Sequence, residues 1–277
     1  MKSSLGVQFA SLLSILCVHV VAAASPDLAL YLAFDDLTPH EQAEWPQDIE
    51  WWRVQDHSMY ASPVILNVTG SALEHVTGVF GAAARVRQDA SIRLNWPHEA
   101  APTEAFSVLF WVHPSGLNSS VSLWADSSTD DKLSVGIGGD LRPRFSVRPQ
   151  ALGGRGWDLP QQDPIDTERW THLAWVYDRP TNLVRLFVDG RLRSEAVVGA
   201  DVPRDWGSPD GRRGWVGIDA HTWQDLADTS IAFDDLNVWK RALSADEARW
   251  VMDHGPRALS VHPRQKQVIA WAQLKPR

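Results

Sequence analysis

Paired carboxylates are the first groups in this sequence that could do chemistry. Retaining glycosidases need two carboxyl groups about 5–5.5 Å apart, one as the nucleophile and one as the general acid. On a strand, acidic residues two or four positions apart supply that spacing, because they point to the same face. The nearest matches are Asp48-Ile-Glu50 and Asp166-Thr-Glu168. Both lie in turn-like sequence and neither has a third acid, so the carboxylate pattern of the glucanases is absent. If the protein is an enzyme, it is a hydrolase or lyase with an unfamiliar site.

Other motifs with a known mechanism fit no better. The ten His residues are dispersed without metal-ligand spacing, and the only cysteine is Cys17. The glycine-rich stretches at 136–139 and 153–156 lack the Lys and the following helix of a phosphate-binding loop. The acidic turn at 126–131 lacks the alternating ligands and central Gly of an EF-hand.

Tryptophan is the abundant residue that suggests binding. The chain has 15, and an aromatic face can stack on a sugar ring or fill a protein pocket. Five that fall in predicted strands are expected in the core or on a sheet face: Trp111, Trp124, Trp170, Trp175 and Trp239. Loop aromatics on a rigid sandwich are the better binding candidates, with folding back over the sandwich ends as the alternative. The candidate ligand-binding residues are Trp51, Trp52, Trp157, Trp206 and Trp223.

Short strands must position these groups. From Leu28 to Trp239 the sequence shows ten or more runs with apolar or alternating patterns, separated by turn residues. Asp189-Gly190 is the strongest hairpin signal, since a tight turn needs residues that tolerate positive φ. Residues 38–70 read as a loop-rich stretch. In the last strand, alternation puts Asp234, Leu236 and Val238 on one face and Asp235 on the other.

One helix is predicted after the last strand. Ser244-Ala-Asp-Glu247 is a capping box, in which the serine side chain and Glu247 satisfy each other's backbone N–H groups. Ala248, Val251 and Met252 form its apolar stripe, and Gly255-Pro256 ends it. We expect this helix to close an open end of the sandwich.

The ends of the chain differ from the middle. Lys2, an apolar run over 7–21 and three alanines at 22–24 match a secretory signal, with an uncleaved anchor as the alternative. We therefore expect a signal peptide over 1–24, one domain over 25–255 and a basic tail over 256–277. The predicted location is secreted or extracytoplasmic, at the periplasm or cell surface, with no membrane span after cleavage.

Charge and composition narrow the partners. Hydrophobic residues make up 44% of the chain and charged residues 22%, which are ordinary values for a chain with a core. A net charge of -8 argues against nucleic acid and anionic membranes as partners. A mature chain without cysteine depends on its core, and on any bound metal, for stability.

Three segments in the right order resemble the laminin-G-like domains of the concanavalin A-like lectin and glucanase superfamily. They are Gly78-Val-Phe-Gly-Ala-Ala-Ala-Arg85, the hairpin from Trp170-Thr-His-Leu-Ala-Trp-Val-Tyr-Asp178 to Val184-Arg-Leu-Phe-Val-Asp-Gly190, and Phe233-Asp-Asp-Leu-Asn-Val-Trp-Lys-Arg-Ala-Leu243 with its capping box. The resemblance implies an all-β fold, a two-sheet antiparallel jelly-roll sandwich with one short C-terminal helix. Asn237 and Lys240 depart from the family pattern, which bears on the ligand more than on the fold.

The same resemblance implies a calcium site. Relatives often hold one calcium ion near the first and last strands, which commonly pair in this fold. Asp35 and Asp36 end the first predicted strand, and Asp234 and Asp235 lie in the last. Calcium takes six to eight oxygen ligands, so these carboxylates with backbone carbonyls could bind a structural ion. The alternative is that both Asp-Asp pairs only cap turns.

Besides a polysaccharide hydrolase or lyase with an unrecognised site, two non-catalytic functions of different classes remain. The favoured one is a secreted, non-catalytic module that binds carbohydrate or glycan, with calcium as a structural ion. The alternative is a structural or adhesive domain that binds a cell-surface protein. Fold alone does not decide between them, because this sandwich hosts unrelated functions.

Overall fold

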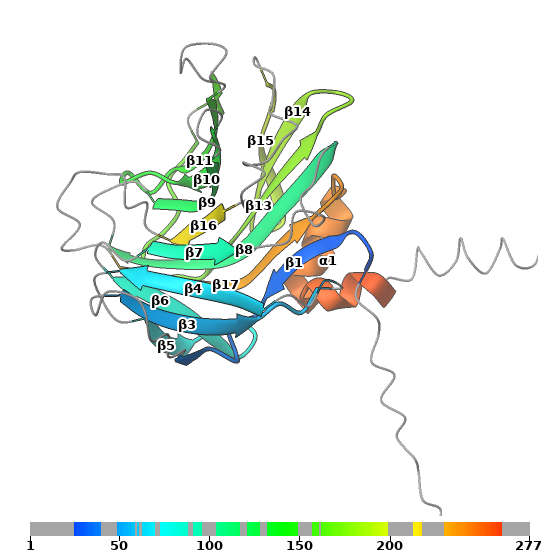
Figure 1. Cartoon of the computed structure of the whole chain (residues 1–277). Coiled ribbons are helices and arrows are strands. Elements are labelled where there is room, and N and C mark those ends of the chain that lie inside the picture. The colour runs from blue at the N-terminus through cyan, green and yellow to red at the C-terminus, as the bar shows by residue number, and fades with distance from the viewer. Residues whose placement is uncertain are drawn as a thin grey trace, which may run out of the picture.

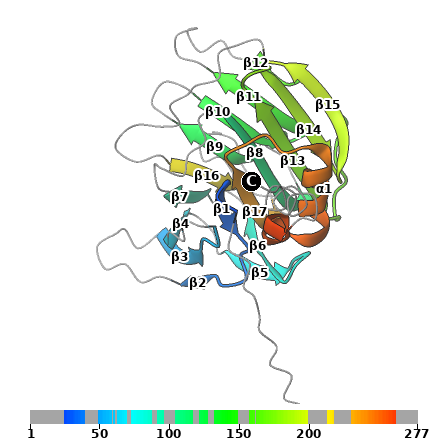
Figure 2. The same ribbon diagram turned by 90° about the vertical axis from the view of Figure 1, so that its right-hand side faces the viewer.

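The chain folds into two layers of antiparallel strands, with a short helix on one outer face (Figures 1 and 2). The structure is a computed structural model that describes residues 25–39, 49–58, 60, 63–69, 73–87, 91–95, 104–116, 121–127, 132–148, 157–160, 162–198, 213–217 and 230–261. The predicted signal peptide over 1–24 lies outside these residues.

The first sheet brings the two ends of the fold together. Its strands are β1 (Leu28–Leu32), β5 (Glu74–Thr77), β6 (Ala82–Arg87), β8 (Ala105–Gly116), β13 (Thr171–Asp178), β14 (Leu183–Val188), β15 (Arg191–Val197) and β17 (Ser230–Trp239). Their order is β15-β14-β13-β8-β17-β6-β5, and β1 also pairs with β17. The expected pairing of the first and last strands is confirmed.

The second sheet carries the remaining strands. They are β2 (Thr38–Pro39), β3 (Ile49–Gln55), β4 (Pro63–Thr69), β7 (Ser91–Asn95), β9 (Val121–Ser127), β10 (Lys132–Ile137), β11 (Pro143–Arg148), β12 (Trp157–Asp158) and β16 (Arg213–Gly217). Their order is β12-β11-β10-β9-β16-β7-β4-β3-β2. The predicted all-β, two-sheet antiparallel sandwich is confirmed.

The main core lies between the two sheets. Alternate residues of β8, β13 and β14 point inward, and Phe110, Trp175 and Leu186 are fully buried there. Val54, Val64 and Phe145 reach the same core from the second sheet. Trp175 and Trp239 are both 0% exposed, in agreement with the prediction that they are core residues.

The predicted helix forms, but it covers a different surface from the one expected. Helix α1 (Ala245–His254) has the full Ser244–Glu247 capping box and ends at Gly255, where φ is 77°. Its buried residues Ala248 and Val251 belong to a second core with Leu109 and Trp239, on the outer face of the first sheet. Outward-facing apolar residues of β8 and β17 need a cover, so α1 packs on this face rather than closing an end of the sandwich.

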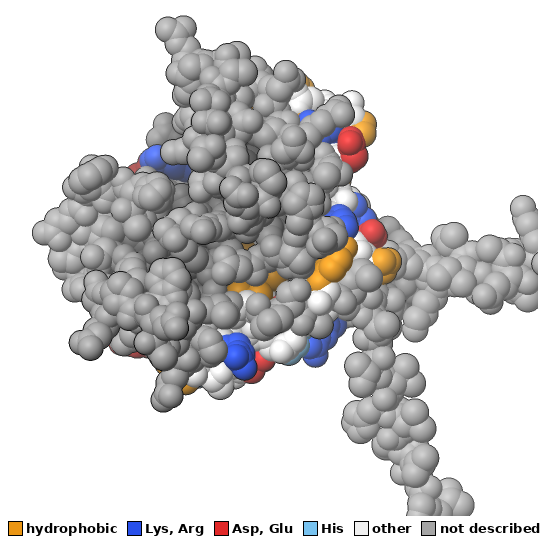
Figure 3. Space-filling view, in the orientation of Figure 1, with side chains coloured by type: hydrophobic (Ala, Val, Ile, Leu, Met, Phe, Trp, Pro, Cys, Tyr) orange, Lys and Arg blue, Asp and Glu red, His pale blue; other side chains and the backbone are white. Residues whose placement is uncertain are grey.

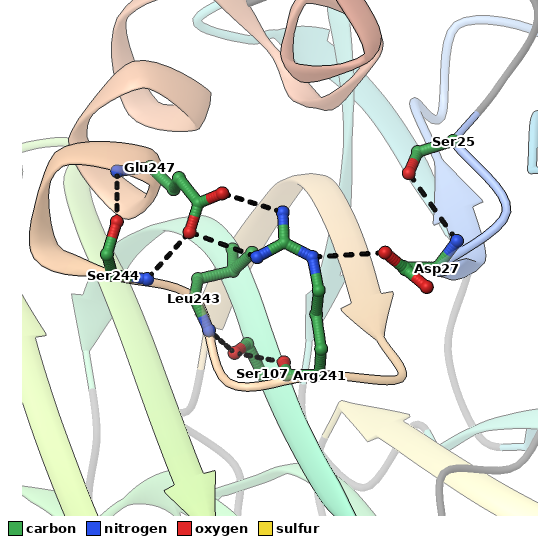
Figure 4. Close-up of polar contacts among 7 residues, drawn as sticks. All are labelled: Ser25, Asp27, Ser107, Arg241, Leu243, Ser244 and Glu247. Atoms are coloured by element: carbon green, nitrogen blue, oxygen red, sulfur yellow. Dashed lines mark hydrogen bonds and ion pairs between the residues drawn. The ribbon is translucent and has the colours of Figure 1, made fainter. Parts of the chain in front are cut away.

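A polar network joins the start of the fold to the helix (Figure 4). Arg241 makes a bidentate pair with Glu247, at 3.0 and 2.8 Å, and its Nε lies 3.2 Å from a carboxylate oxygen of Asp27. Ser107 donates to the Arg241 carbonyl and accepts from Leu243 N–H. Burial opposes ionisation, yet the bonds from Arg241 and Ser244 hold the pKa of Glu247 below its usual range.

In two parts of the chain, the structure has more regular structure than the sequence led us to expect. The stretch at 38–70 was expected to be a loop, but it contains β2 and the hairpin of β3 with β4. Aromatic and β-branched residues favour paired strands, and this preference outweighs the turn signals in the stretch. At the other end, a 3-10 helix η3 (Pro256–Val261) follows α1, and Leu259 is buried in the second core. Packing therefore continues past the boundary expected at residue 255.

Candidate functional site

Three of the four candidate metal residues, Asp35, Asp234 and Asp235, lie where β1 and β6 share one side of β17. Residues 230–233 of β17 pair with β6, whereas residues 236–239 pair with β1. Asp234 and Asp235 lie between these two ladders, at the point where the end of β1 faces the start of β6. This junction is the centre of the site.

A β-bulge determines which way the two carboxylates point. The pairing of β17 with β8 shifts register between Asp234 and Asn237, and Asp235 has a φ of 50°. Phe233, Leu236 and Val238 therefore share the inner face, and the expected grouping of Asp234 with Leu236 and Val238 is wrong. Simple alternation fails because the bulge adds one residue to the strand.

Asp234 holds the turn that precedes β6. Its Oδ2 accepts hydrogen bonds from Val79 N at 2.6 Å and Phe80 N at 3.1 Å. A Cβ at Gly78 would lie 2.3 Å from this oxygen, so the backbone approaches closely only because residue 78 is glycine. Burial raises the pKa of Asp234, although the two N–H bonds oppose the shift.

Asp35 fixes the other end of the same turn. Its Oδ1 accepts from Ala82 N at 2.7 Å, which connects the end of β1 to the start of β6. Gly81 has a φ of 106°, and a Cβ there would lie 2.3 Å from the same oxygen. Phe80, at the tip of the turn, is 37% exposed. We call residues 78–82 the Phe80 turn.

Asp235 is buried beside the first strand. Its Oδ1 accepts from the Tyr31 hydroxyl at 2.7 Å, and burial together with the charge of Asp234 raises its pKa to about 7. Burial and Asp235 also raise the pKa of Tyr31. Asp234 Oδ1 and Asp235 Oδ2 are buried without a hydrogen-bond partner among the described residues. Two such oxygens on adjacent carboxylates are unusual, because buried acceptors are normally satisfied.

Asp36 lies apart from this junction. Its side chain is 39% exposed, accepts from Gln55 N at 3.3 Å and lies 3.8 Å from His57 Nε2. Of the four predicted metal residues, Asp35 and Asp234 therefore bind the Phe80 turn, Asp235 lies next to Asp234 and is bonded to Tyr31, and Asp36 contacts Gln55 and His57 instead.

The donor set fits a calcium ion better than a transition metal. Within the described residues, no group of three or more His, Cys, Asp and Glu side chains has metal-binding geometry. Calcium does not require one, since backbone carbonyls and water complete its oxygen shell. Asp234 and Asp235 each offer a buried oxygen with no hydrogen bond inside the described part of the chain. These two residues would hold the ion, which would neutralise the buried charge.

The predicted ligand-binding tryptophans lie in different settings. Trp51 and Trp52 belong to β3 and Trp157 to β12, so the expectation that all three are in loops is wrong. Trp52 and Trp157 are partly buried against the core, and Trp157 meets Phe145 edge to face. The Trp51 side chain, Trp206 and Trp223 lie outside the described residues.

Three further residues shape the site and were not predicted from the sequence. Asp56 is buried and accepts from Tyr31 N and from both Ser58 N and Ser58 Oγ. Arg257, at the start of η3, lies over the Tyr31 ring at 5.6 Å from its centroid. The third residue is Tyr31. It was the only one of the three with a signal in the sequence, because its polar-tipped side chain occupies an outward-facing position of an apolar strand.

Comparison with known proteins identifies the family. Residues 88–249 match the family described as the Concanavalin A-like lectin/glucanases superfamily. The chain belongs to this superfamily. No curated protein matches the sequence. The match lies inside the two-sheet sandwich and includes β17 and the capping box, so the resemblance of the sequence motifs to this superfamily is confirmed.

Several solved toxin structures have a similar fold. The binding domain of botulinum neurotoxin serotype G has a TM-score of 0.59 and 14% identity over 82% of this chain. The binding domain of Paraclostridial Mosquitocidal Protein 1 has 0.57 and 13% over 81%. A structure of botulinum neurotoxin type C, whose cell entry depends on two ganglioside molecules, has 0.57 and 11% over 82%. This chain spans 51% of the length of each of these three toxin structures.

Across the described residues of this superfamily member, no helix is both long enough and apolar enough to cross a bilayer.

Proposed function

We propose that this chain is a secreted, non-catalytic glycan-binding module that is stabilised by one calcium ion. The observation that carries the proposal is the junction of β1, β6 and β17. There, two adjacent buried carboxylates each have an oxygen without a partner in the described residues, beside a turn that presents an exposed aromatic ring.

The physical role of the ion follows from the contacts of the carboxylates. Asp234 binds the Phe80 turn through two backbone N–H groups, so a cation on its other oxygen would fix that carboxylate in its ionised form. Asp235 has a raised pKa and would be held ionised in the same way. Calcium would thereby order the Phe80 turn and the end of β1 together.

The superfamily includes both lectins and glucanases, and two observations support binding rather than catalysis. The structural neighbours of this chain include toxin binding domains, and one of those toxins depends on gangliosides for cell entry. The full sequence lacks the carboxylate pattern of the glucanases. The N-terminal sequence, with its signal-like pattern, supports an extracytoplasmic location.

A glycan array with the full-length mature chain tests this function. The array is probed with 1 mM calcium and again with excess EDTA. We expect binding to a subset of glycans that decreases at least about tenfold when calcium is removed, because the binding surface loses its ordering ion. Absence of glycan binding in both conditions would contradict the proposal.

A matched pair of variants separates the loss of the metal site from a general loss of stability. Asp234→Asn removes the charge at the junction and keeps an oxygen that can accept the two N–H bonds. Asp253→Asn makes the same change on the exposed surface of α1. We expect only Asp234→Asn to lose the calcium dependence. Equal behaviour of the two variants would exclude the junction as the metal site.

A protein partner is the second candidate function. Leu192 and Val197 are 52% and 64% exposed on β15, which is an edge strand of the first sheet in the described structure. An edge strand offers unpaired backbone groups to an incoming strand. A pull-down of one protein that is unaffected by sugars and abolished by Leu192→Lys would favour this function.

A further inference from the structure

A second feature lies away from the junction of β1, β6 and β17, at the β14–β15 edge of the first sheet. Residues 162–169 cross from the second sheet to β13, and Ile165 on this crossing segment is buried in the main core. Between the segment and the β14–β15 hairpin is a cavity of about 170 Å³. Its lining includes Asp163, Asp166, Arg169 and Arg193.

Arg169 is held in place before any ligand arrives. Its Nε donates to Asp166 at 3.1 Å, and its Nη1 donates to Asp189 at 3.0 Å. The other oxygen of Asp189 accepts from His172 N at 2.9 Å, so the guanidinium is connected to the backbone of β13. No hydrogen bond from Nη2 to another described residue is present, which leaves these two N–H groups to donate to a ligand.

The hairpin that carries this arrangement is also rigid. Asp189 and Gly190 have φ values of 49° and 69°, as a tight two-residue hairpin turn requires. Arg249 of α1 donates to the Gly190 carbonyl at 3.1 Å, which ties the turn to the helix. A site built on such fixed elements loses little conformational entropy when it binds a ligand.

The walls of the cavity offer both polar and apolar contacts. Pro164 supplies an exposed apolar wall, and Ile165 and Val188, which are 6% and 8% exposed, lie beneath it as part of the core. Arg193 of β15 lies 3.9 Å from Asp163 of the crossing segment. The Asp163 side chain is 86% exposed, so this ion pair is weak and its groups can turn to a ligand.

Size and charge together indicate the class of ligand. At about 170 Å³ the cavity is smaller than the roughly 300–1,000 Å³ of sites for drug-sized ligands, which suits one sugar ring and not an extended chain. Two arginines and two aspartates line it, so the lining has no net charge, and Asp189 adds a further negative charge behind Arg169. In Figure 3 also, Lys or Arg and Asp or Glu side chains lie next to one another along the right-hand edge of the described surface.

We infer that this cavity binds one neutral sugar unit of a glycan. The ring's C–H groups pack on Pro164. Its hydroxyl groups donate to Asp163 and Asp166 and accept from Arg169 and Arg193. The inference rests on the proposed glycan-binding function and adds to it a second sugar subsite, separate from the Phe80 turn, with its ligand class. An acidic sugar is disfavoured, because its carboxylate would enter a site that already contains an excess of carboxylates.

Saturation-transfer NMR with the full mature chain tests the inference. The probes are methyl glycosides of neutral hexoses and methyl glucuronide, which differs from methyl glucoside by its carboxylate. We expect at least one neutral hexoside to bind and methyl glucuronide to bind at least about tenfold more weakly than methyl glucoside. Asp166→Ala and Arg193→Ala each remove a charged hydrogen-bond partner and should weaken binding about tenfold or more.

Arg191→Ala is the control, because Arg191 is exposed on the same hairpin and does not line the cavity. Its affinity should equal that of the wild type, and melting temperatures verify that all variants are folded. Glycan binding that is unchanged in Asp166→Ala and Arg193→Ala would overturn this inference and leave the proposed function intact. Preference for the glucuronide would overturn the ligand class. Absence of any glycan binding by the wild type would overturn both proposals.

Discussion

The Tyr31 hydroxyl donates a 2.7 Å hydrogen bond to Asp235, and this bond joins the first strand to the last inside a buried site. The bond satisfies one oxygen of Asp235, whereas Oδ2 has no partner in the described structure. Burial of this carboxylate next to Asp234 is therefore unfavourable unless a proton or a cation is present. Both the pH dependence of stability and the binding of calcium should therefore depend on the protonation of Asp235.

Without calcium, deprotonation of Asp235 should lower the stability of the wild type from about pH 5 to pH 8, and below about pH 6.5 this contribution opposes that of His172. The folded-state pKa of Asp235 is about 7, above its unfolded value, so the folded state binds an extra proton that is lost as pH rises. The free energy of unfolding should fall by up to about 1.4 kcal/mol per pH unit in this window. Urea denaturation in EDTA measures it, and Asp235→Asn should lack this component. Identical slopes in both proteins would contradict the raised pKa.

Calcium should reverse this dependence. Its ligands must be ionised, and protonation of Asp235 competes with the ion below pH 7. We expect the calcium-induced increase in melting temperature to be larger at pH 8 than at pH 5. Asp36→Asn should keep the full increase, because Asp36 is exposed and contacts Gln55 and His57 instead. Loss of the increase in Asp36→Asn would show that the ion lies elsewhere.

A substitution at Gly81 tests whether Asp35 holds the Phe80 turn. Gly81→Ala would place a methyl group 2.3 Å from Asp35 Oδ1 at a φ of 106°, whereas Gly255→Ala has only the strain of a positive φ, with nothing within 4 Å of its Cβ. Backbone strain at a positive φ costs about 1–3 kcal/mol at each site, and we expect Gly81→Ala to cost at least about 1 kcal/mol more because of its contact with Asp35. Equal losses in urea denaturation would mean that Asp35 does not hold the turn.

His172 should make the protein sensitive to acid. It is buried, and desolvation lowers its pKa to about 3, despite the nearby charge of Asp189. Between about pH 6.5 and 3 the unfolded chain binds a proton that the folded chain excludes, so stability is lost as pH falls. His172→Phe should show a shallower decrease between pH 6 and pH 4.5. A wild-type decrease no steeper than that of the variant would argue against a buried neutral imidazole.

The motifs of the sequence predicted much of this fold but less of its site. Asp189-Gly190 and the Ser244 capping box depend on local geometry, and both formed as predicted. The bulge at Asp235 was missed because period-2 alternation contains no signal for an inserted residue. Trp157 was placed in a loop because two-residue strands such as β12 depend on tertiary pairing. The Arg169 cavity joins residues of two elements that have no common sequence motif.

Calorimetric titration of calcium into the metal-free, full-length mature chain at pH 8 tests the central claim most directly. We predict one ion bound per chain, with a higher melting temperature, and an affinity reduced at least about tenfold in Asp234→Asn and unchanged in Asp253→Asn. A titration without binding heat, with no shift in melting temperature and no calcium in the purified protein, would contradict the account.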